Sequence, residues 1–450
     1  MRHSALLTDF YQMTMAYSYW QAGMHDQEAV FHLFFRRNPN TGHYVIAAGL
    51  ESVITFLKTF QFEEEDIAYL ASLREPVFSA DFLAYLKTLR FTGDIDAVPE
   101  GSVVFAHEPL LRIRAPLLLC QLLETPLINA LNFASTVASM ASRLRWIGKQ
   151  DALFEFGLRR AQGPNGGLTA SRSAYLGGCD ATSNMLAGKH YGIPVVGTMA
   201  HSWVMAFDDE RDAFQAYAEF NPNNVILLVD TYDTLTGVDH AITVGNMLRK
   251  KNIALKGVRL DSGDLLTLSQ KAREKLNQAG FQNTRIYVSG DITEERMHTL
   301  KSHHAPIDGW GIGTHLSTCS LQPALDMVYK LGAIKKEGEW KYKLKRSDNR
   351  VKTSDPGILQ VRRFYAEKKW LRDVIYLEED KMHCSDEQSH DLLQPIFRNG
   401  QCVYAEPSLD TIRQFCLSEV QAFMQADPEH YSVTRDAHLM ALKKQLMDNE

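Results

Sequence analysis

The sequence has few cysteines, no long apolar run and little net charge. Its 450 residues include six cysteines that are widely scattered and form no CxxC pair, so neither a zinc knot nor a disulfide framework is indicated. No stretch approaches the roughly 18 consecutive apolar residues that a membrane span requires. A net charge of −6 on a chain this long gives no reason to expect a nucleic-acid surface. The composition is typical of a large enzyme with reduced thiols and no membrane partner.

The start of the chain argues against secretion. Residues 1–17 read MRHSALLTDFYQMTMAY and meet acidic Asp9 too early to build the apolar core of a signal peptide. We therefore expect a cytoplasmic protein. The length allows a sizeable core and two or three domains.

One locally basic stretch, KKEGEWKYKLKRSDNRVK at 335–352, has two interpretations. It could bind nucleic acid, or it could form a solvated antiparallel hairpin with Gly338 near the turn. The alternation of Trp340, Tyr342 and Leu344 favours the hairpin.

Five short apolar segments in the middle of the chain each end on a polar residue. The segments are 193–201, 224–230, 254–261, 285–291 and 307–314, and they end on His201, Asp230, Asp261, Asp291 and Thr314. The steps between these end residues are 29, 31, 30 and 23 positions, by subtraction. One strand, its crossover helix and two loops need about 30 residues. The pattern predicts buried parallel strands in an α/β barrel or wound sheet, with all strand ends facing one site.

Segments outside this region predict a separate α+β layer. Strand-like pieces occur at 31–35, 44–49 and 102–116, and again at 327–334, 341–346 and 359–365, before a polar helical tail. We expect an N-terminal part at 1–130, a catalytic core at 131–325 and a C-terminal part at 326–450 that packs with the first.

The strand ends predict a site for a phosphorylated substrate. Glycines at 290, 311 and 313 would let backbone N–H groups approach a phosphate, although such glycines also make ordinary tight turns. Carboxylates cluster at the same ends, and phosphate beside carboxylates usually needs Mg²⁺. These carboxylates are Asp230, Asp233, Asp261, Asp264 and Asp291. Asp261 and Asp264 could instead cap the following helix.

Cationic and nucleophilic candidates complete the predicted site. Arg159, Arg160 and Arg259 can offer planar bidentate donors to a carboxylate or phosphate, or form surface ion pairs instead. Among 16 histidines only His201 sits at a strand end between small residues, in GTMAHS. A neutral imidazole there can act as nucleophile, base or metal ligand.

Long motifs in this chain resemble nicotinate phosphoribosyltransferase. The two longest are FGLRRAQGPNGGLTASRSAYLGGCDATSN at 156–184 and GIPVVGTMAHSWVMAF at 192–207. Supporting matches are LLTDFYQMTMA, FHLFFRRNP, EPLLRIRAP, QLLETPLINALNF, VRLDSGDL and GIGTHLSTC, in family order over most of the chain. One departure follows FFRRNP, where family members commonly continue with Phe and a run of Gly and this chain reads NTGHY.

The resemblance implies an irregular TIM-like α/β barrel joined to an α+β domain built from both termini, assembled as a homodimer with shared active sites. It implies that nicotinate and phosphoribosyl pyrophosphate give nicotinate mononucleotide and pyrophosphate in NAD salvage. It also implies Mg²⁺ and coupled ATP hydrolysis through a phosphohistidine at His201, in an enzyme classed as a ligase.

The resemblance also implies residue roles. Catalysis would involve His201, Asp261 and Arg259. Phe156 would stack on the pyridine, with Tyr11 of the partner subunit on its other face, while Arg259 and Thr198 hold the carboxylate end. Ribose, phosphates and metal would be held by Arg159, Asp230, Asp261, Gly290, Asp291, Gly313 and Thr314. Mg²⁺ would be held through phosphates, with Asp261 and Asp291 as candidate protein contacts.

Three rival functions stay open at this point. The sister enzyme that uses nicotinamide is the nearest, because Asp180 could accept hydrogen bonds from an amide base. A sugar-phosphate aldolase or isomerase would commonly need a lysine at a strand end, and none of the five ends carries one. A non-catalytic metabolite sensor of the same fold is the third.

Overall fold

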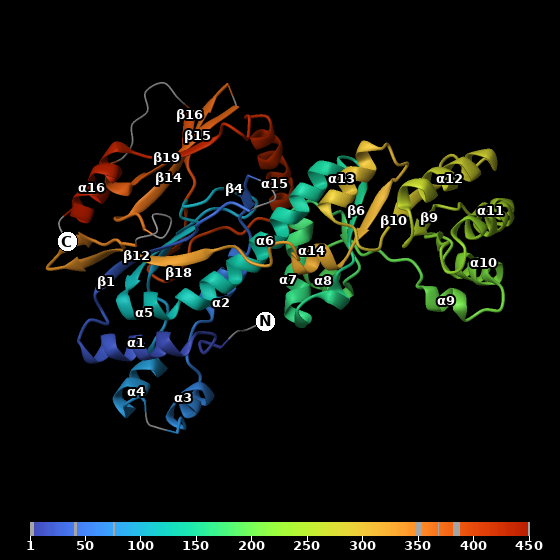
Figure 1. The fold of residues 1–450 in the computed structure, drawn as a ribbon. Coiled ribbons are helices and arrows are strands. Elements are labelled where there is room, and N and C mark those ends of the chain that lie inside the picture. The colour runs from blue at the N-terminus through green and yellow to red at the C-terminus, as the bar shows by residue number, and fades with distance from the viewer. Residues whose placement is uncertain are drawn as a thin grey trace. The chain divides into compact units, whose positions relative to one another are not determined.

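The computed structural model describes residues 4–39, 43–74, 77–347, 353–367, 369–380 and 388–448 (Figure 1). The chain divides into two compact units, the first made of residues 1–139 and 324–450 and the second of residues 140–323. The sequence predicts the central part at 131–325. Cys384 and the first three residues of the NTGHY departure, 40–42, lie outside the described residues, and the other five cysteines are free thiols.

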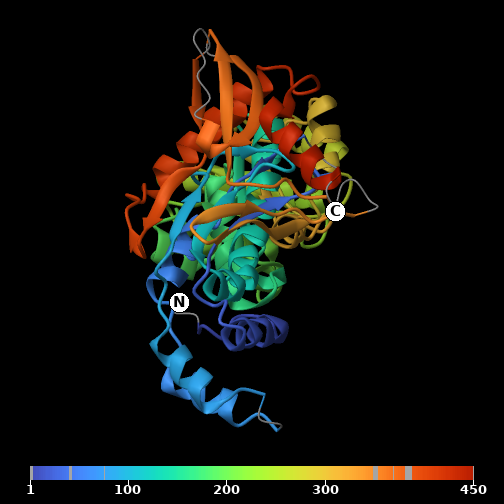
Figure 2. The ribbon, with the colours of Figure 1, turned by 90° about the vertical axis from the view of Figure 1, so that its left-hand side faces the viewer.

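The first unit contains a seven-stranded sheet in which segments from both chain ends pair. Its strand order is β13-β12-β1-β5-β3-β17-β18. The strands are β1 (Glu28–Phe35), β3 (Asp94–Ala97), β5 (Leu111–Pro116), β12 (Met327–Lys336), β13 (Glu339–Tyr342), β17 (Gln394–Arg398) and β18 (Gln401–Cys402). β1 pairs antiparallel with both β5 and β12, so blue and orange strands lie side by side in Figures 1 and 2.

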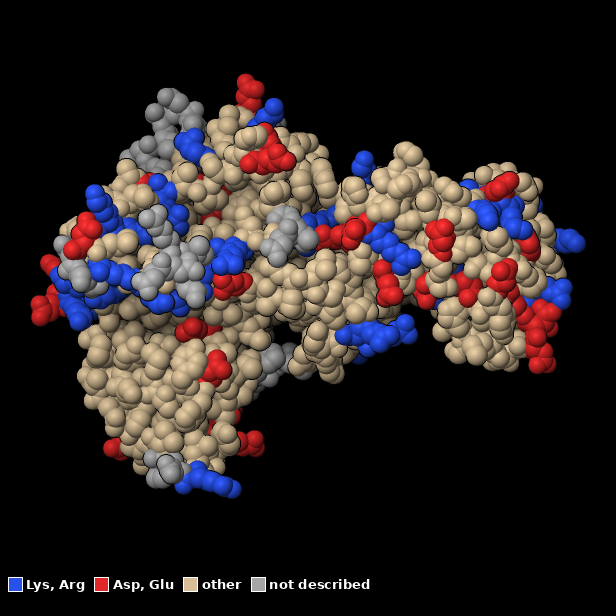
Figure 3. Space-filling model, viewed as in Figure 1, with Lys and Arg blue, Asp and Glu red and all other residues tan. Residues whose placement is uncertain are grey.

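Within the basic stretch at 335–352, residues 335–342 form the antiparallel hairpin that the alternation predicts, and residues 348–352 lie outside the described part of the chain. β12 pairs with β13, and Gly338 turns the chain with a φ of +84°. On the face viewed in Figure 3, basic and acidic side chains of the described residues are interspersed.

Smaller sheets and helices complete the first unit. A four-stranded sheet has the order β16-β14-β15-β19, and β2 (Val45–Ile46) pairs with β4 (Val103–Val104). The strands of the four-stranded sheet are β14 (Leu359–Ala366), β15 (Lys369–Leu377), β16 (Gln388–Asp391) and β19 (Ser432–Arg435). The helices are α1 (Phe10–Gln21), α2 (Leu50–Lys58), α3 (Glu64–Ala71), α4 (Ala80–Thr88), α5 (Leu117–Leu122), α15 (Leu409–Met424) and α16 (Ala437–Asp448), with α6 (Glu124–Gly148) running on into the second unit.

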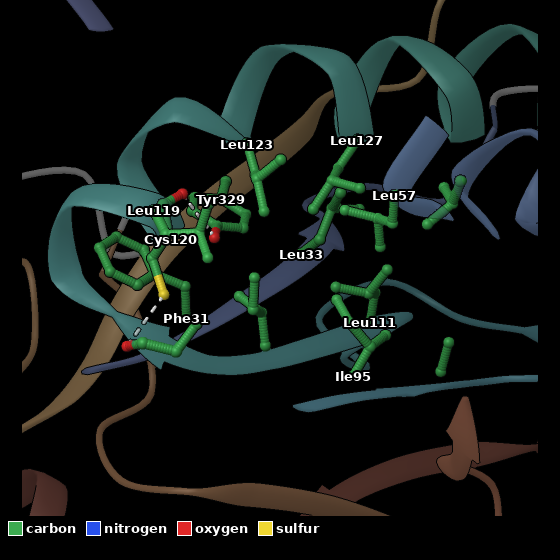
Figure 4. Close-up of a cluster of buried hydrophobic side chains, with 14 of the residues drawn as sticks. Phe31, Leu33, Leu57, Ile95, Leu111, Leu119, Cys120, Leu123, Leu127 and Tyr329 are labelled. Atoms are coloured by element: carbon green, nitrogen blue, oxygen red, sulfur yellow. Dashed lines mark hydrogen bonds between the residues drawn. The ribbon is translucent and has the colours of Figure 1, made fainter. Parts of the chain in front are cut away.

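The core of the first unit lies between the large sheet and the helices α5 and α6 (Figure 4). Leu33, Ile95 and Leu111 come from neighbouring strands and are fully buried, and Leu123 and Leu127 pack over them. Burying one such side chain contributes about 1.5–3 kcal/mol. The side chains of these strands on this face are apolar because helices cover it, while Asp and Arg residues alternate with them in β3 and β5.

The second unit is built on a six-stranded parallel sheet with the order β7-β6-β11-β10-β9-β8. Its strands are β6 (Ala152–Glu155), β7 (Ala181–Thr182), β8 (Ile226–Leu228), β9 (Gly257–Leu260), β10 (Arg285–Val288) and β11 (Gly309–Ile312). β8 to β11 lie inside four of the five predicted segments. The α/β prediction is confirmed.

The fifth predicted strand, 193–201, was wrong. Val195 makes a single bridge to Thr182, and the helix α9 (His201–Met205) already begins at His201. Pro194 contributes to this difference, because it has no N–H to donate to a ladder and only accepts, from Thr182 N. β6 and β7 were not predicted.

The segment around Gly197 contacts both edges of the sheet. Val196 N donates to Thr182 O of β7 over 3.0 Å, and the Asn224 side chain before β8 donates to Gly197 O over 2.9 Å. In the described part of the chain, strand pairing leaves β7 and β8 as edges, so backbone ladders do not close a barrel.

Helices connect the parallel strands and give their ends one direction. The crossover helices are α11 (Thr234–Lys250), α12 (Leu265–Gln278) and α13 (Glu294–Ser302). The remaining helical elements are η1 (Leu158–Arg160), α7 (Gly163–Leu176), α8 (Met185–Tyr191), α10 (Glu210–Phe220) and α14 (Thr314–Thr318). No helix among the described residues is long and apolar enough to cross a membrane.

Candidate active site

A cleft of about 650 Å³ opens at the carboxyl ends of β6, β9, β10 and β11. In open parallel sheets and in barrels, ligands bind at this end of the strands. Ten of the thirteen predicted site residues line the cleft, and they are Phe156, Arg159, Thr198, His201, Arg259, Asp261, Gly290, Asp291, Gly313 and Thr314. Arg160, Ser183, Ser289 and His315 also line it, and only Arg160 was among the candidates that sequence reasoning singled out.

His201 is held between a hydroxyl and a carboxylate. Its Nδ1 lies 3.2 Å from Thr231 Oγ1, and its Nε2 lies 3.9 Å from Asp261 Oδ2. The side chain is 40% exposed, which leaves the ring accessible from the cleft. A neutral imidazole has one donor and one acceptor nitrogen, so this arrangement orients the ring without blocking it.

Asp261 is fixed by two neighbours at the strand ends. Its Oδ1 accepts from Ser289 Oγ, and its own backbone N donates to Asp230 Oδ2 over 2.8 Å. Asp230 also accepts from Ser262 Oγ over 2.8 Å and is only 8% exposed. Asp230 therefore supports the turn at Asp261 and does not itself line the cleft, and its contact with substrate stays a prediction.

Arg259 points into the cleft from β9. Its Nη1 donates to Thr198 Oγ1, and its buried Nε has no partner within the described residues. Burial lowers the pKa of the Arg259 guanidinium, while Asp261 and Asp230 act to raise it. A guanidinium beside a hydroxyl is a suitable pair of donors for a carboxylate ligand.

Phe156 forms an aromatic wall that depends on a neighbouring glycine. A Cβ placed on Gly311 would lie 2.6 Å from two ring carbons of Phe156, so only glycine leaves the ring in place. The ring also lies near Phe154, with centroids 6.0 Å apart and planes 22° apart.

A buried carboxylate that sequence reasoning missed fixes the turn at Phe156. Glu155 ends β6 and is 1% exposed. It accepts from Gly157 N, from Ser171 Oγ over 2.8 Å and from Thr182 Oγ1 over 2.6 Å. The available signal was an acidic residue inside an otherwise apolar strand, FEFG, because a buried carboxylate needs several donors.

The loop after β10 contains two consecutive residues in left-handed conformation. Gly290 has a φ of +83°, and a Cβ on it would lie 1.9 Å from Asp261 O. Asp291 follows with a φ of +48°. Arg296 Nη1 donates to Gly290 O over 2.9 Å and so satisfies a carbonyl of this loop. The glycine is therefore required by close backbone approach as well as by φ.

Two of the five clustered carboxylates are helix caps. Asp233 Oδ1 accepts from Thr236 N over 2.9 Å, and Asp264 Oδ1 accepts from Leu266 N over 3.2 Å. Their hydrogen bonds lower the pKa of both carboxyls. Asp261 and Asp291 remain as the carboxylates that line the cleft. In the described part of the chain no group of three or more His, Cys, Asp or Glu residues could hold a metal by itself.

Asp180 lies away from the cleft. It precedes β7, forms an ion pair with Arg145 over 2.6 Å and accepts from Leu153 N over 2.9 Å. These contacts place it at the amino end of its strand, and it is not among the residues that line the cleft. The prediction that Asp180 contacts the base stays a prediction. Tyr11 lies on α1 in the first unit and is 50% exposed.

Comparisons with known proteins agree with the motifs that line this cleft. Models of the nicotinate phosphoribosyltransferase N-terminal domain, family and C-terminal domain match residues 6–132, 152–401 and 360–443. The chain belongs to the nicotinate phosphoribosyltransferase family. Family membership covers both units, including the discontinuous first one.

Curated relatives and a solved structure are similar over most of their length. A nicotinate phosphoribosyltransferase of Mycobacterium tuberculosis is 41% identical, covering 93% of this chain and 87% of that protein. That of Bacillus subtilis is 38% identical, covering 95% and 92%. The crystal structure of human nicotinic acid phosphoribosyltransferase superposes with a TM-score of 0.85 at 33% identity, covering 98% of this chain and 99% of the human one.

Proposed function

We propose that the cleft joins nicotinate to the ribose of phosphoribosyl pyrophosphate, giving nicotinate mononucleotide and pyrophosphate, and that ATP hydrolysis drives the transfer through phosphorylation of His201. Nicotinate phosphoribosyl transfer in NAD biosynthesis follows from the family. The observation that carries the proposal is the gathering of ten predicted site residues in one cleft at the carboxyl ends of the strands.

The nicotinate site is proposed between the ring of Phe156 and the Arg259–Thr198 pair. The pyridine would stack on Phe156, and its carboxylate would accept from the guanidinium and from the Thr198 hydroxyl. Charge-assisted bonds of this kind are stronger than the neutral ones an amide base would make. Nicotinate is therefore the expected base.

The sugar phosphate is proposed to lie against the loops after β10 and β11. Gly290, Asp291, Gly313 and Thr314 would approach its phosphate, and Arg159 would supply a cationic partner. The carboxylates of Asp261 and Asp291 are hard oxygen donors of the kind Mg²⁺ takes in addition to phosphate oxygens. Bound there, Mg²⁺ would neutralise charge on the pyrophosphate leaving group.

In the proposed transfer the bond from the anomeric carbon to pyrophosphate breaks, and a bond to the pyridine nitrogen forms. Catalysis comes from holding both partners in line and from charges placed around the cation-like sugar. Asp261, fixed by Ser289 and Asp230, is the carboxylate placed for this stabilisation.

ATP coupling is proposed to pass through a phosphohistidine. A ring nitrogen of His201 attacks the γ-phosphorus, ADP leaves, and water later releases phosphate from the ring. The ring is accessible in the cleft and oriented by Thr231 and Asp261, which supports this role. The phosphoryl group would add charge and acceptor oxygens beside the sugar-phosphate site.

A homodimer with shared active sites is also proposed. Phe10 and Tyr11 are 58% and 50% exposed on α1, and Met185 and Leu186 are 71% and 55% exposed at the start of α8. Association of two copies would cover such apolar side chains. In the same proposal, Tyr11 of the partner subunit contacts the base.

Two finer points of the family description remain proposals. The contacts of the Gly197 segment support closure of the sheet into an irregular barrel, through a backbone hydrogen bond at the β7 edge and a side-chain hydrogen bond next to β8. The cytoplasm is the proposed compartment, in keeping with free thiols among the described cysteines.

The direct test of function is product formation from each base. Purified protein with phosphoribosyl pyrophosphate, Mg²⁺ and ATP is expected to form mononucleotide from nicotinate and not from nicotinamide. Omission of ATP is expected to slow the reaction. Preference for nicotinamide would contradict the proposed base site.

A further inference from the structure

A second cavity, of about 710 Å³, lies at the amino ends of β9 and β10. Its walls come from the end of α11, the segment 252–256 before β9 and the segment 280–285 that leads into β10. The candidate active site lies at the opposite ends of the same strands. No residue lines both cavities.

The second cavity carries positive charge without a counter-charge. Arg249, Lys256 and Arg285 line it, and no lining residue is a carboxylate. None of the three forms an ion pair within the described residues. Neighbouring lysines differ, since Lys251 pairs with Glu219 over 2.7 Å and Lys275 pairs with Asp239 over 2.8 Å. Three cations at one cavity of a chain with net charge −6 make a local positive field that attracts anions.

Two of these cations are held in place by groups that leave their charge intact. Arg249 stacks over the ring of Phe281 at 4.3 Å and donates from Nη2 to Gly280 O over 2.9 Å. Lys256 donates from Nζ to Asn223 O over 2.5 Å. A guanidinium has five N–H donors, so one carbonyl bond leaves most of them available.

Hydrogen bonds from Arg273 also hold the segment before β10 that lines the cavity. Arg273 donates to the carbonyls of Gln282 and Thr284 over 3.0 Å and 2.6 Å, which fixes the segment before β10. A nearby acid, Asp308, accepts from Ile286 N over 2.8 Å and does not line the cavity. These hydrogen bonds hold the segment that leads into Arg285, the first residue of β10.

The floor of the cavity is aromatic. A Cβ on Gly245 would lie 2.8 Å from the ring of Phe281, and one on Gly257 would lie 2.6 Å from the ring of Tyr287. These two glycines let the rings lie flat against the backbone. Aromatic walls with a few placed polar groups, in a volume of roughly 300–1,000 Å³, are typical of small-molecule sites.

We propose that this cavity is a binding site for a phosphate-bearing small molecule, separate from the active site. Its phosphate oxygens accept from Arg249, Lys256 and Arg285, and Tyr287 offers a half-buried ring to the rest of the ligand. Nucleotides and inorganic polyphosphates share this phosphate chemistry. The site adds to the proposed transferase function and does not depend on it.

The test is equilibrium dialysis of radiolabelled ATP at fixed ionic strength, with the full-length protein. The Arg249→Gln/Arg285→Gln variant is expected to bind one ATP fewer per chain than the wild type. The matched control is Lys251→Gln/Lys275→Gln, which removes the same charge from paired lysines outside the cavity and is expected to bind like the wild type. The result is the difference in bound ATP per chain between the wild type and the cavity variant, so ATP bound at the active site cancels.

A second arm uses inorganic tripolyphosphate as competitor. Displacement of the extra ATP shows that phosphates alone suffice, and failure to displace it shows that the nucleoside contributes. Equal ATP binding by the cavity variant and the wild type overturns the proposal. If the double variant does not fold, judged by circular dichroism, Arg285→Gln alone is compared with Lys251→Gln alone, with a weakened extra site expected only in the first.

Discussion

The imidazole Nδ1 of His201 lies 3.2 Å from the hydroxyl oxygen of Thr231. This contact fixes the ring that would carry the phosphoryl group. Thr231→Val removes the hydroxyl and keeps the shape of the side chain. Loss of one hydrogen bond of about 1 kcal/mol is expected to lower the rate of His201 phosphorylation roughly fivefold. The rate of label transfer from γ-labelled ATP measures it.

Thr243→Val is the matched control for Thr231. Thr243 Oγ1 donates to Asp239 O on the exposed face of α11, away from the cleft. Its phosphorylation rate is expected to equal that of the wild type. Equal loss in both variants would show that His201 does not need the Thr231 hydroxyl.

The Arg259–Thr198 pair predicts how the base is chosen. Arg259→Gln removes a charged donor, and hydrogen bonds to charged groups contribute about 1.5–3 kcal/mol. The KM for nicotinate is expected to rise by roughly 10- to 100-fold by the same reckoning. Steady-state kinetics with nicotinate and nicotinamide measure the change in preference.

Asp180→Asn serves as the control for base choice. Asp180 pairs with Arg145 at the start of β7 and does not line the cleft. The preference for nicotinate is expected to stay unchanged in this variant. A gain of nicotinamide turnover there would mean that Asp180 reaches the base after all.

Gly290 predicts a structural requirement at the phosphate loop. Gly290→Ala adds a Cβ 1.9 Å from Asp261 O, which forces two strand ends apart, and activity is expected to fall by roughly a hundredfold or more. Gly192→Ala is the matched control, because Gly192 has a similar φ of +73° and nothing within 4 Å of its Cβ. It is expected to lose only about 1–2 kcal/mol of stability. Urea unfolding and turnover of both variants distinguish the effect of the steric clash from the effect of the positive φ.

Glu419 in the first unit predicts a pH-dependent stability. Burial raises its pKa to about 7, although Arg363, whose Nη1 donates to Glu419 Oε2 over 3.1 Å, acts to lower it. The folded state then holds a proton that the unfolded state releases above the ordinary glutamate pKa of 4.5. Stability from this group is therefore present below pH 4.5 and declines as pH rises to 7, by about 3 kcal/mol.

Glu419→Gln is expected to remove that decline. Unfolding free energies of the wild type and the variant, measured in urea at intervals from about pH 4.5 to about pH 7.5, give the difference. A difference that stays constant over this range would mean that Glu419 titrates near its ordinary pKa.

The proposed shared site predicts complementation between two inactive variants. Tyr11→Ala and His201→Ala remove groups that one site would take from different subunits. Mixed and allowed to exchange subunits, they are expected to recover about a quarter of wild-type activity, because half of the dimers carry one intact site. If subunits exchange and activity does not recover, Tyr11 and His201 of each site come from the same subunit.

Much of the second unit could be predicted from its apolar segments. β8 to β11 are largely buried, so most of their residues are apolar and the strands stand out from the polar helices between them. The segment 193–201 has the same composition, yet Pro194 and its neighbours pair by one bridge only. β7 has two residues, too few to give any periodic signal.

Residues at the strand ends that line the cleft could be predicted from the sequence. Residues that support them from outside the cleft could not. Asp261 and Asp264 stand three positions apart, and only the folded arrangement shows that one lines the cleft while the other caps α12. Asp230 ends a strand as Asp261 does, but its carboxylate turns back to Asp261 N. The direction of a side chain at a strand end depends on the conformation of the neighbouring loop. The sequence of the strand alone does not determine that conformation.

The measurement that tests the central claim most directly is transfer of ³²P from γ-labelled ATP to the wild-type protein and to His201→Ala, with mononucleotide formation followed in the same samples. We expect acid-labile label on the wild type, none on the variant, and ATP-stimulated product from nicotinate only in the wild type. Equal labelling of both proteins, or ATP-stimulated turnover by the variant, would contradict coupling through His201.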